Sequence, residues 1–183
     1  MSRQKARVLD SRTVYKGPLF SVRTEYVLEP GVTDRSKSVR RDLIAHHGSV
    51  VLLPVLPNGS VLLVRQYRHA VGQYLWELVA GHIDRGEAPL AAARRELSEE
   101  TGYTARRLHK LIDVFPTPGF LSEHMVVYSC HGLKAGTARP EDDESIEVRA
   151  FTRRELEKMM RTRRLRDAKS IASLLFYWRF VAR

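Results

Sequence analysis

Apolar residues recur along the chain with two different spacings. Alternating or continuous β-branched runs, which are typical of strands, occupy residues 11–17, 19–31, 36–48, 49–56, 60–68, 75–81, 107–115, 124–133 and 145–151. Helical spacing occupies residues 89–101, 153–160 and 168–181. Pro89 and Gly102 are suited to begin and end the first of these helices. The order of the elements predicts a mixed α/β (α+β) fold.

The first 68 residues are predicted to be strands joined by tight turns. Up to residue 48 the chain contains extended, alternating pieces that resemble a small antiparallel sheet. Pro57-Asn58-Gly59 then separates two apolar runs, residues 49–56 and 60–68. Because Asn-Gly tolerates positive φ, this tripeptide predicts a hairpin between the two runs.

The length and composition suit one domain of ordinary size. At 183 residues the chain can bury most of the surface that its unfolded form exposes. The single cysteine, Cys130, excludes an intramolecular disulfide and any multi-cysteine zinc site, and it is predicted to be a small buried apolar residue. No apolar run approaches the roughly 20 residues that cross a bilayer, and the first residues lack the apolar core of a signal peptide. We therefore expect a cytoplasmic protein without a membrane segment.

The formal net charge of +10 favours anionic partners, including phosphate-bearing ligands. Arginines gather in residues 161–169, beside the last predicted helix. No recognisable RNA-binding module accompanies them, so we interpret this cluster as a solvated helix surface. A nucleic-acid partner is not expected.

The predicted helix 89–101 carries three glutamates on one side of this otherwise basic chain. Glu96, Glu99 and Glu100 fall within an arc of roughly 100°, because successive helical residues turn by about 100°. Like charges at these spacings cost about 0.2–0.5 kcal/mol per pair, and a bound cation would offset that repulsion. The neighbouring arc, predicted to face a core, holds Leu90, Ala93 and Leu97.

This helix and the loop before it form a specific motif. In order, it consists of Gly81, five residues, Glu87, seven residues, Arg95-Glu96-Leu97, one residue, Glu99-Glu100, one residue, Gly102 and Tyr103. The segment resembles the Nudix box, and only Tyr103 departs slightly, because an aliphatic residue is usual there. The resemblance implies a Nudix fold, which is an α/β/α sandwich with a mixed sheet, preceded here by the small N-terminal antiparallel sheet.

The resemblance also implies a metal-dependent pyrophosphohydrolase. The implied metal ligands are Glu96, Glu99, Glu100 and the carbonyl oxygen of Ala80. Ligands that are all oxygen atoms suit Mg²⁺, with Mn²⁺ as the alternative. Glu99, as a metal ligand, is also counted among the catalytic residues. Glu87 is expected to support the ligands without binding the metal, and Arg95 is expected to hold a motif glutamate in place by ion pairing.

The residues on either side of the motif indicate which subgroup of the family the chain resembles. Residues 64–84, VRQYRHAVGQYLWELVAGHID, resemble the strand and approach loop of ADP-ribose pyrophosphatases and related nucleoside diphosphate sugar hydrolases. Pro118, sixteen residues beyond Gly102, matches the proline that marks the ADP-ribose subgroup. The implied reaction is Mg²⁺-dependent hydrolysis of ADP-ribose to AMP and ribose 5-phosphate, with other nucleoside diphosphate sugars as further candidate substrates.

The subgroup implies a homodimer with a shared nucleotide pocket. Residues 1–48 would be a β-sheet region for dimerisation and substrate binding, and residues 49–183 would be the Nudix hydrolase domain.

Seven residues are implied to contact the substrate: Phe20, Arg41, Arg68, Glu77, Pro118, Gly119 and Glu123. Phe20 is a candidate for stacking on the base, with packing in the core or dimer as the alternative. Arg41 and Arg68 offer paired donors to phosphate oxygens, with surface ion pairing as the alternative. Glu77 and Glu123 are candidate acceptors for sugar hydroxyl groups.

The base that activates water is expected outside the motif, because a carboxylate bound to a cation is a poor proton acceptor. The acidic segment near residue 140 offers Glu141, Asp142, Asp143 and Glu144. The resemblance to ADP-ribose pyrophosphatases implies that a glutamate of the corresponding loop serves as this base. Glu144 is the first choice because it lies nearest the following predicted strand, and Asp142 is the second.

Three other functions are compatible with the sequence. GDP-mannose hydrolysis differs from ADP-ribose hydrolysis by only a few contacts of modest energy. An RNA 5′-end pyrophosphohydrolase is supported by the net charge of +10 and by the arginine cluster. A regulator that binds a nucleotide sugar without cleaving it is disfavoured by the intact motif.

Overall fold

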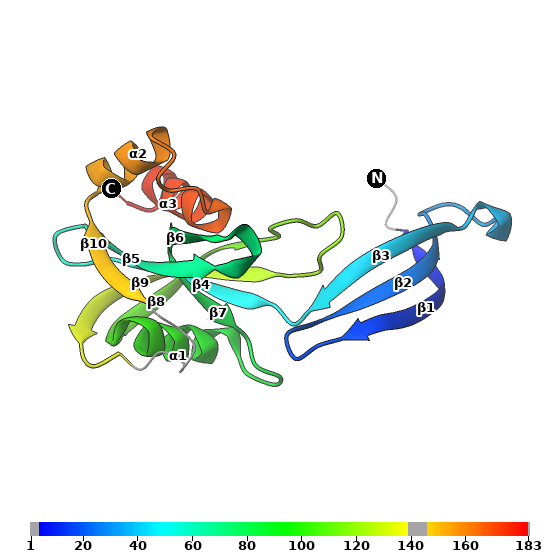
Figure 1. The fold of residues 1–183 in the computed structure, drawn as a ribbon, viewed down its shortest axis with the longest axis horizontal. Helices are drawn as coiled ribbons and strands as arrows, with labels where there is room; N and C mark the ends of the chain where they lie inside the picture. Colours follow the sequence, from blue (N-terminus) through cyan, green and yellow to red (C-terminus); the bar gives the residue numbers. More distant parts are fainter. Residues whose placement is uncertain (1–3, 139–145, 183) are drawn as a thin grey trace. The chain divides into compact units, whose positions relative to one another are not determined.

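The structure is a computed structural model that describes residues 4–138 and 146–182. The chain divides into two compact units. The first takes in residues up to Gly48 together with Phe115–His124, and the second takes in Ser49–Val114 and the residues from Met125 onward. Both units are drawn in Figure 1.

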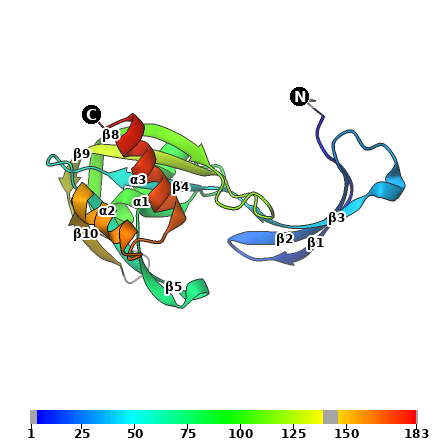
Figure 2. The same ribbon diagram turned by 90° about the horizontal axis from the view of Figure 1, so that it is seen from above.

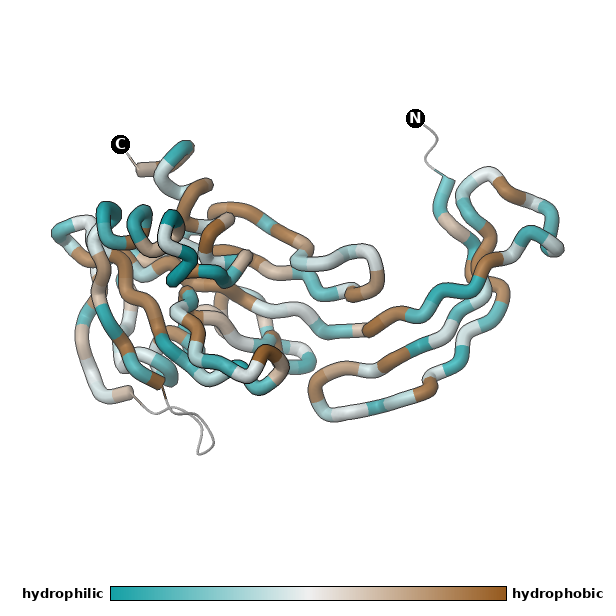
Figure 3. The backbone as a smooth tube through the Cα atoms, turned by 45° about the horizontal axis from the view of Figure 1, so that its top comes forward, coloured by the Kyte–Doolittle hydropathy of each residue, from teal (hydrophilic) through white to brown (hydrophobic). Residues whose placement is uncertain are grey.

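The first unit is built on a three-stranded antiparallel sheet, as the alternating sequence pattern predicts. Its strands, in the order β1-β2-β3, are β1 (Arg7–Lys16), β2 (Phe20–Leu28) and β3 (Val39–His46), with the short 3-10 helix η1 (Arg35–Lys37) before β3. Hydrophilic and hydrophobic stretches are interspersed along this unit in Figure 3. The segment 115–124 joins the unit through β3, because Ile44 N donates to Phe120 O at 2.7 Å and Ser122 N donates to Ile44 O at 2.9 Å.

The second unit contains two further sheets. A mixed sheet has the order β7-β4-β9-β8, in which β4 and β9 are parallel and the other neighbours are antiparallel. An antiparallel sheet has the order β10-β5-β6. The bounds of these strands are β4 (Ser49–Pro54), β5 (Val61–Arg68), β6 (Gln73–Glu77), β7 (Val79–His82), β8 (Tyr103–Val114), β9 (Met125–Ala135) and β10 (Glu147–Phe151), with the 3-10 helix η2 (His69–Val71) before β6.

Helices cover both faces of the strand layer, which gives an α/β/α sandwich (Figures 1 and 2). They are α1 (Pro89–Thr101), α2 (Arg153–Arg161) and α3 (Ala168–Phe180). The fully buried strand β4 explains the layers, because its successive side chains point to opposite faces. Val50 and Leu52 pack in a core with Leu97 of α1, whereas alternate residues of β4 pack in a second core with the other two helices.

Two predicted elements are wrong in detail. The apolar run 75–81 is not one strand, because it breaks at Leu78 into β6 and β7, which belong to different sheets. The chain does reverse at Pro57-Asn58-Gly59, where Asn58 Oδ1 accepts from Ser60 N at 3.0 Å. Across this turn the chain forms the isolated bridge Val55–Val61, and Leu56 N donates to Ser60 O at 2.8 Å. However, β4 and β5 themselves pair with other strands, so no regular hairpin forms.

Helix α1 has the predicted ends but a different buried stripe. Pro89 occupies its first turn, and Gly102 ends it with φ 72°, donating its N–H to Ser98 O. The buried side consists of Ala92, Ala93, Leu97, Glu100 and Thr101. The prediction that Leu90 faces the core is wrong, because Leu90 lies in the first turn of the helix and is 44% exposed.

Two simpler predictions can also be compared with the structure. Cys130 is fully buried, as predicted, and burial raises the pKa of its thiol to about 12. No helix within residues 4–138 and 146–182 has the length and apolar character needed to span a bilayer.

Candidate functional site

Helix α1 brings the three predicted metal ligands to one side, close to strand β7. Glu100 is buried at 5% exposure, although it carries a carboxylate. The Glu96 side chain is 12% exposed and the Glu99 side chain is 40% exposed. These three residues, called the acidic face below, therefore range from buried to open along the helix.

Arg95 links this acidic face to the loop before the helix. Its Nη1 atom donates to Glu96 Oε1 at 2.7 Å and to Glu99 Oε2 at 3.0 Å. Its Nε and Nη2 atoms donate to the two oxygens of Glu87 at 3.1 and 3.0 Å. The Nη2 atom also donates to the carbonyl oxygen of His82 at 2.9 Å. The prediction that Arg95 pairs with motif glutamates is confirmed by these contacts.

These contacts shift the ionisation of both partners. The hydrogen bonds with Glu87 are the main cause that raises the pKa of Arg95, and those with Glu96 and Glu99 add to it. In turn, the hydrogen bonds from Arg95 lower the pKa of Glu87. Asp84 N also donates to Glu87 Oε2 at 3.1 Å. Glu87 thus holds Arg95 and the loop, while Arg95 holds Glu96 and Glu99.

Strand β7 approaches the acidic face through a glycine. Ala80 packs against the core on the α2–α3 side, so Gly81, the next residue, faces the α1 side. A Cβ atom added to Gly81 would lie 1.9–2.2 Å from the carboxyl atoms of Glu96. Only glycine therefore lets the Glu96 carboxylate lie where it does. The same strand carries the Ala80 carbonyl, which is the fourth predicted metal ligand.

A hollow of about 500 Å³ lies beside the acidic face, lined by Arg95, Ser98, Glu99 and Thr137. The chain passes this hollow at the end of α1, where Gly102 meets the backbone of residues 136–138. A Cβ atom on Gly102 would lie 2.5 Å from Ala138 N. The four candidates for the general base, Glu141, Asp142, Asp143 and Glu144, lie outside the described residues.

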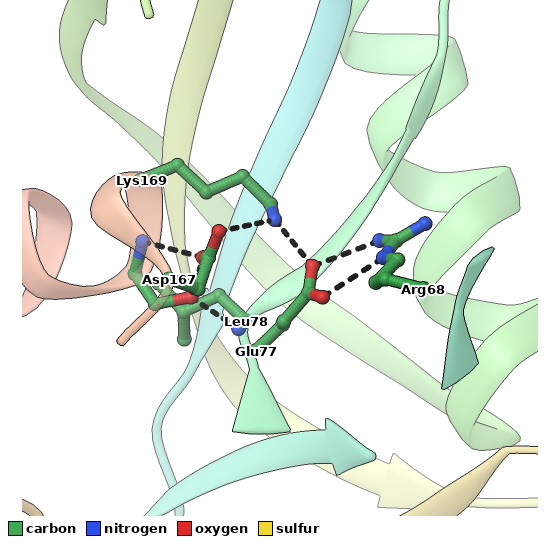
Figure 4. Close-up of polar contacts among 6 residues, drawn as sticks. Arg68, Glu77, Leu78, Asp167 and Lys169 are labelled. Carbon is green, nitrogen blue, oxygen red and sulfur yellow. Dashed lines mark hydrogen bonds and ion pairs between the residues drawn. The ribbon is translucent and has the colours of Figure 1, made fainter. Parts of the chain in front are cut away.

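Arg68 and Glu77, predicted to contact the substrate, pair with each other on β5 and β6 (Figure 4). Arg68 Nε and Nη2 each donate to one oxygen of Glu77 at 2.8 Å. Glu77 is 1% exposed, whereas the Arg68 side chain is 39% exposed. The pair therefore places a buried carboxylate behind a partly open guanidinium.

The N-cap and first turn of α3 add three residues that the sequence did not single out: Asp167, Lys169 and Ser170. Lys169 Nζ donates to Glu77 Oε2 and, at 2.9 Å, to Asp167 Oδ1. Leu78 N donates to Ser170 Oγ at 2.7 Å. We call Arg68, Glu77 and these three residues the Glu77 network. Asp167 was recognisable only as a helix N-cap, because nothing local in the sequence joins it to a strand 90 residues earlier.

The contacts within the Glu77 network favour the charged forms of Glu77 and Arg68. Burial alone would raise the pKa of Glu77, but the hydrogen bond from Arg68 and the charge of Lys169 outweigh it, so the pKa lies below its ordinary value. The hydrogen bond to Glu77 is the main cause that raises the pKa of Arg68, and the negative charge of Glu100 adds to it. The charge of the acidic face therefore also acts on Arg68.

The remaining predicted contacts lie in the first unit. Phe20 is 36% exposed, and its ring centroid lies 5.8 Å from that of Tyr15. Arg41 pairs with Glu29 through Nη2 and Oε1, and its side chain is 54% exposed. The segment that joins β3 carries Pro118, Gly119 and Glu123.

No cluster of three or more His, Cys, Asp or Glu side chains is arranged to hold a metal within the part of the chain that the structure describes. Arg95 instead provides the positive charge beside Glu96 and Glu99. The donors nevertheless fit a hard divalent cation, because all are oxygen atoms and Gly81 leaves space for the Glu96 carboxylate.

The layered fold, the acidic helix and the preceding glycine define a Nudix protein. A family model of the NUDIX domain matches residues 45–174, and the chain belongs to that family. A solved structure described as an ADP compounds hydrolase has a TM-score of 0.80 and 23% sequence identity, and the match covers 99% of this chain and 96% of that one. The predicted family and fold are confirmed.

Characterised relatives are similar over most of the chain. ADP-ribose pyrophosphatase of Bacillus subtilis (strain 168) is 31% identical over 171 residues, or 92% of each chain. ADP-ribose pyrophosphatase of Mycobacterium tuberculosis (strain ATCC 25618 / H37Rv) is 37% identical over 77% of this chain and 66% of its own. GDP-mannose pyrophosphatase of Yersinia enterocolitica is 33% identical over 71% of this chain and 72% of its own. The prediction of a pyrophosphohydrolase enzyme is confirmed.

Proposed function

We propose that this enzyme hydrolyses the pyrophosphate bond of ADP-ribose to give AMP and ribose 5-phosphate, with Mg²⁺ as its cofactor. The observation that carries the proposal is the acidic face, in which Arg95 and Gly81 hold the carboxylates of Glu96 and Glu99. The names of the Bacillus subtilis and Mycobacterium tuberculosis relatives support ADP-ribose as the substrate.

Four groups would hold the metal: Glu96, Glu99, Glu100 and the carbonyl oxygen of Ala80. A bound Mg²⁺, or Mn²⁺ in its place, supplies Lewis acidity toward the diphosphate and lowers the pKa of a bound water molecule. The chain's part is to keep the carboxylates in place before the substrate arrives. Glu87 does this indirectly, because it holds Arg95 through both oxygens.

The other groups bind the substrate and accept the proton. Arg68 would bind a phosphate oxygen, since Glu77 fixes the plane of its guanidinium. Because Glu77 is 1% exposed and bonded to two cations, we assign it to orienting Arg68. Glu144 remains our first choice for the general base, followed by Asp142. The proposed contacts from the first unit are Phe20, Arg41, Pro118, Gly119 and Glu123.

We also propose a homodimer formed through the first unit. Its sheet leaves several large apolar side chains exposed: Val8, Val14, Tyr15, Leu19, Phe20 and Tyr26. Burial of such exposed apolar side chains against a second copy of the sheet would stabilise a dimer. Sedimentation at micromolar concentration should give the mass of a dimer, and a fully active monomer would contradict the proposal. The single cysteine is consistent with the cytoplasmic location that the sequence predicts.

GDP-mannose hydrolysis is the second candidate function, and the similarity to GDP-mannose pyrophosphatase of Yersinia enterocolitica supports it. Base and sugar preference depends on a few contacts of modest energy, so a direct comparison is needed. The purified enzyme with Mg²⁺ should be offered ADP-ribose, GDP-mannose, diadenosine polyphosphates and triphosphorylated RNA. We expect the highest kcat/KM for ADP-ribose, with AMP and ribose 5-phosphate as products. A higher value for GDP-mannose or RNA would replace the proposal.

A further inference from the structure

Glu77 has two cationic partners, although one would neutralise it. Its two oxygens accept from Arg68 at 2.8 Å, and Oε2 also accepts from Lys169. Since Glu77 is 1% exposed, it depends on these partners for stabilisation of its charge. With Lys169 present, Arg68 does not have to balance that charge alone.

Lys169 is fixed in this position from two directions. Its side chain is only 12% exposed, and Asp167 Oδ1 accepts a second hydrogen bond from Nζ at 2.9 Å. Its neighbour Ser170 fastens the same helical turn to the sheet, because Leu78 N donates to Ser170 Oγ at 2.7 Å. Leu78 lies between the end of β6 and the start of β7. The first turn of α3 is therefore attached to the strand that continues to Ala80 and Gly81.

Arg68 remains partly open despite its contacts with Glu77. The Nε and Nη2 atoms face the carboxylate, while the third guanidinium nitrogen carries no bond to the residues drawn in Figure 4. The side chain is 39% exposed. The bidentate pair fixes the plane of the guanidinium, so the direction of the third nitrogen is fixed as well.

We infer that Lys169 is a positioning residue: by sharing the Glu77 carboxylate with Arg68, it keeps the Arg68 guanidinium available for the phosphate groups of the substrate. This inference rests on the proposed function, in which Arg68 contacts the diphosphate. Without Lys169, Arg68 would be the sole counter-charge of a buried carboxylate, and the local charge would fall by one. Both changes weaken the attraction of Arg68 for an anion.

The test compares Lys169→Met with Lys169→Arg, which keeps the charge. Binding of ADP-ribose and of AMP is measured by calorimetry in EDTA, where turnover is absent, and kcat and KM are then measured with Mg²⁺. For Lys169→Met we expect Kd and KM to rise by about tenfold, the scale of one charge-assisted contact, with kcat changed less. Lys169→Arg should restore most of the affinity. The matched control is Lys158→Met, which removes an exposed helical lysine and should leave Kd unchanged.

A second comparison separates positioning from direct contact. If Lys169 acts mainly through Glu77, the effect of Lys169→Met on Kd should be clearly smaller in a Glu77→Gln background, where only the loss of one local charge remains. A full tenfold loss in that background would show that Lys169 contacts the ligand itself and would overturn the inference. If Lys169→Met does not fold, Lys169→Gln replaces it, since glutamine retains a donor toward Glu77.

The remaining outcomes are also decisive. Unchanged Kd and KM in Lys169→Met, even with a lower melting temperature, would show a merely structural role and overturn the inference while the proposed function stands. A wild-type enzyme that neither binds nor cleaves ADP-ribose would contradict the proposed function, and the inference with it.

Discussion

The carboxylate of Glu96 lies directly against the backbone of Gly81, where a Cβ atom would come within 1.9 Å of its carboxyl carbon. Glu96 belongs to α1 and Gly81 to β7, so this contact sets the spacing between the acidic helix and the neighbouring strand. The carboxylate is held on its other side by Arg95 Nη1 at 2.7 Å. A single methyl group at residue 81 would therefore act on the proposed metal site before it acts on the core.

We expect Gly81→Ala to raise the Mg²⁺ concentration needed for half-maximal activity by about tenfold or more, because the Glu96 carboxylate must move away from the new methyl group. The fold should survive, since the clash is with the end of a flexible side chain. Turnover of ADP-ribose measured against Mg²⁺ concentration checks the first expectation, and a thermal melt checks the second. An unchanged Mg²⁺ requirement would mean that the position of Glu96 does not matter for the metal.

Arg95 should not be replaceable by lysine. Its guanidinium spans three carboxylates, those of Glu87, Glu96 and Glu99, and a single ammonium group cannot reproduce that fork. We expect Arg95→Lys to lower kcat/KM by about tenfold to a hundredfold while net charge is preserved. Arg94→Lys is the matched control, since Arg94 is the adjacent residue on α1 and its Nη1 atom donates to the carbonyl oxygen of Ala105 instead. Equal losses in the two variants would refute a special role for Arg95.

Removal of one charged ligand should remove most of the turnover. Glu99→Gln and Glu100→Gln keep the size of the side chain but lose its charge, and we expect each to lower kcat by about a hundredfold or more. Glu157→Gln, which alters a partly exposed helical glutamate paired with Arg153, should change kcat very little. Full activity of either variant at limiting Mg²⁺ would contradict the assignment of that glutamate as a metal ligand.

Local patterns in the sequence predicted much of the acidic site. Pro89, Gly102 and the spacing of the glutamates define helix α1, and Arg95 lies four residues from Glu99, where helical side chains meet. The three-stranded sheet of the first unit follows from its alternating residues. Each of these features depends on residues that lie close together in the sequence.

Long-range contacts account for what the sequence did not reveal. At the strand break, Leu78 N donates to Ser170 Oγ, 92 residues later in the chain. Lys169 meets Glu77 over the same separation. No periodicity encodes such pairs, so the sequence did not reveal that Glu77 is bonded to Arg68 and Lys169. Leu90 was misplaced for another reason, because the helical angle alone does not show how exposed the first turn of a helix is.

The last prediction concerns the general base. Glu96 and Glu99 already interact with Arg95 and are the proposed metal ligands, so a separate carboxylate is needed to accept the proton. Glu144 is our first choice, and general-base catalysis typically contributes 10²–10⁴-fold, so Glu144→Gln should lower kcat by about that factor. Its effect on Kd for Mg²⁺ and for ADP-ribose should be small, because the residue would act on the attacking water. Asp142→Asn and Asp143→Asn provide the comparison within the same segment. A loss in Glu144→Gln smaller than about threefold at saturating substrate would exclude Glu144 and direct the search to Asp142, whereas a parallel loss of Mg²⁺ binding would make Glu144 a metal ligand.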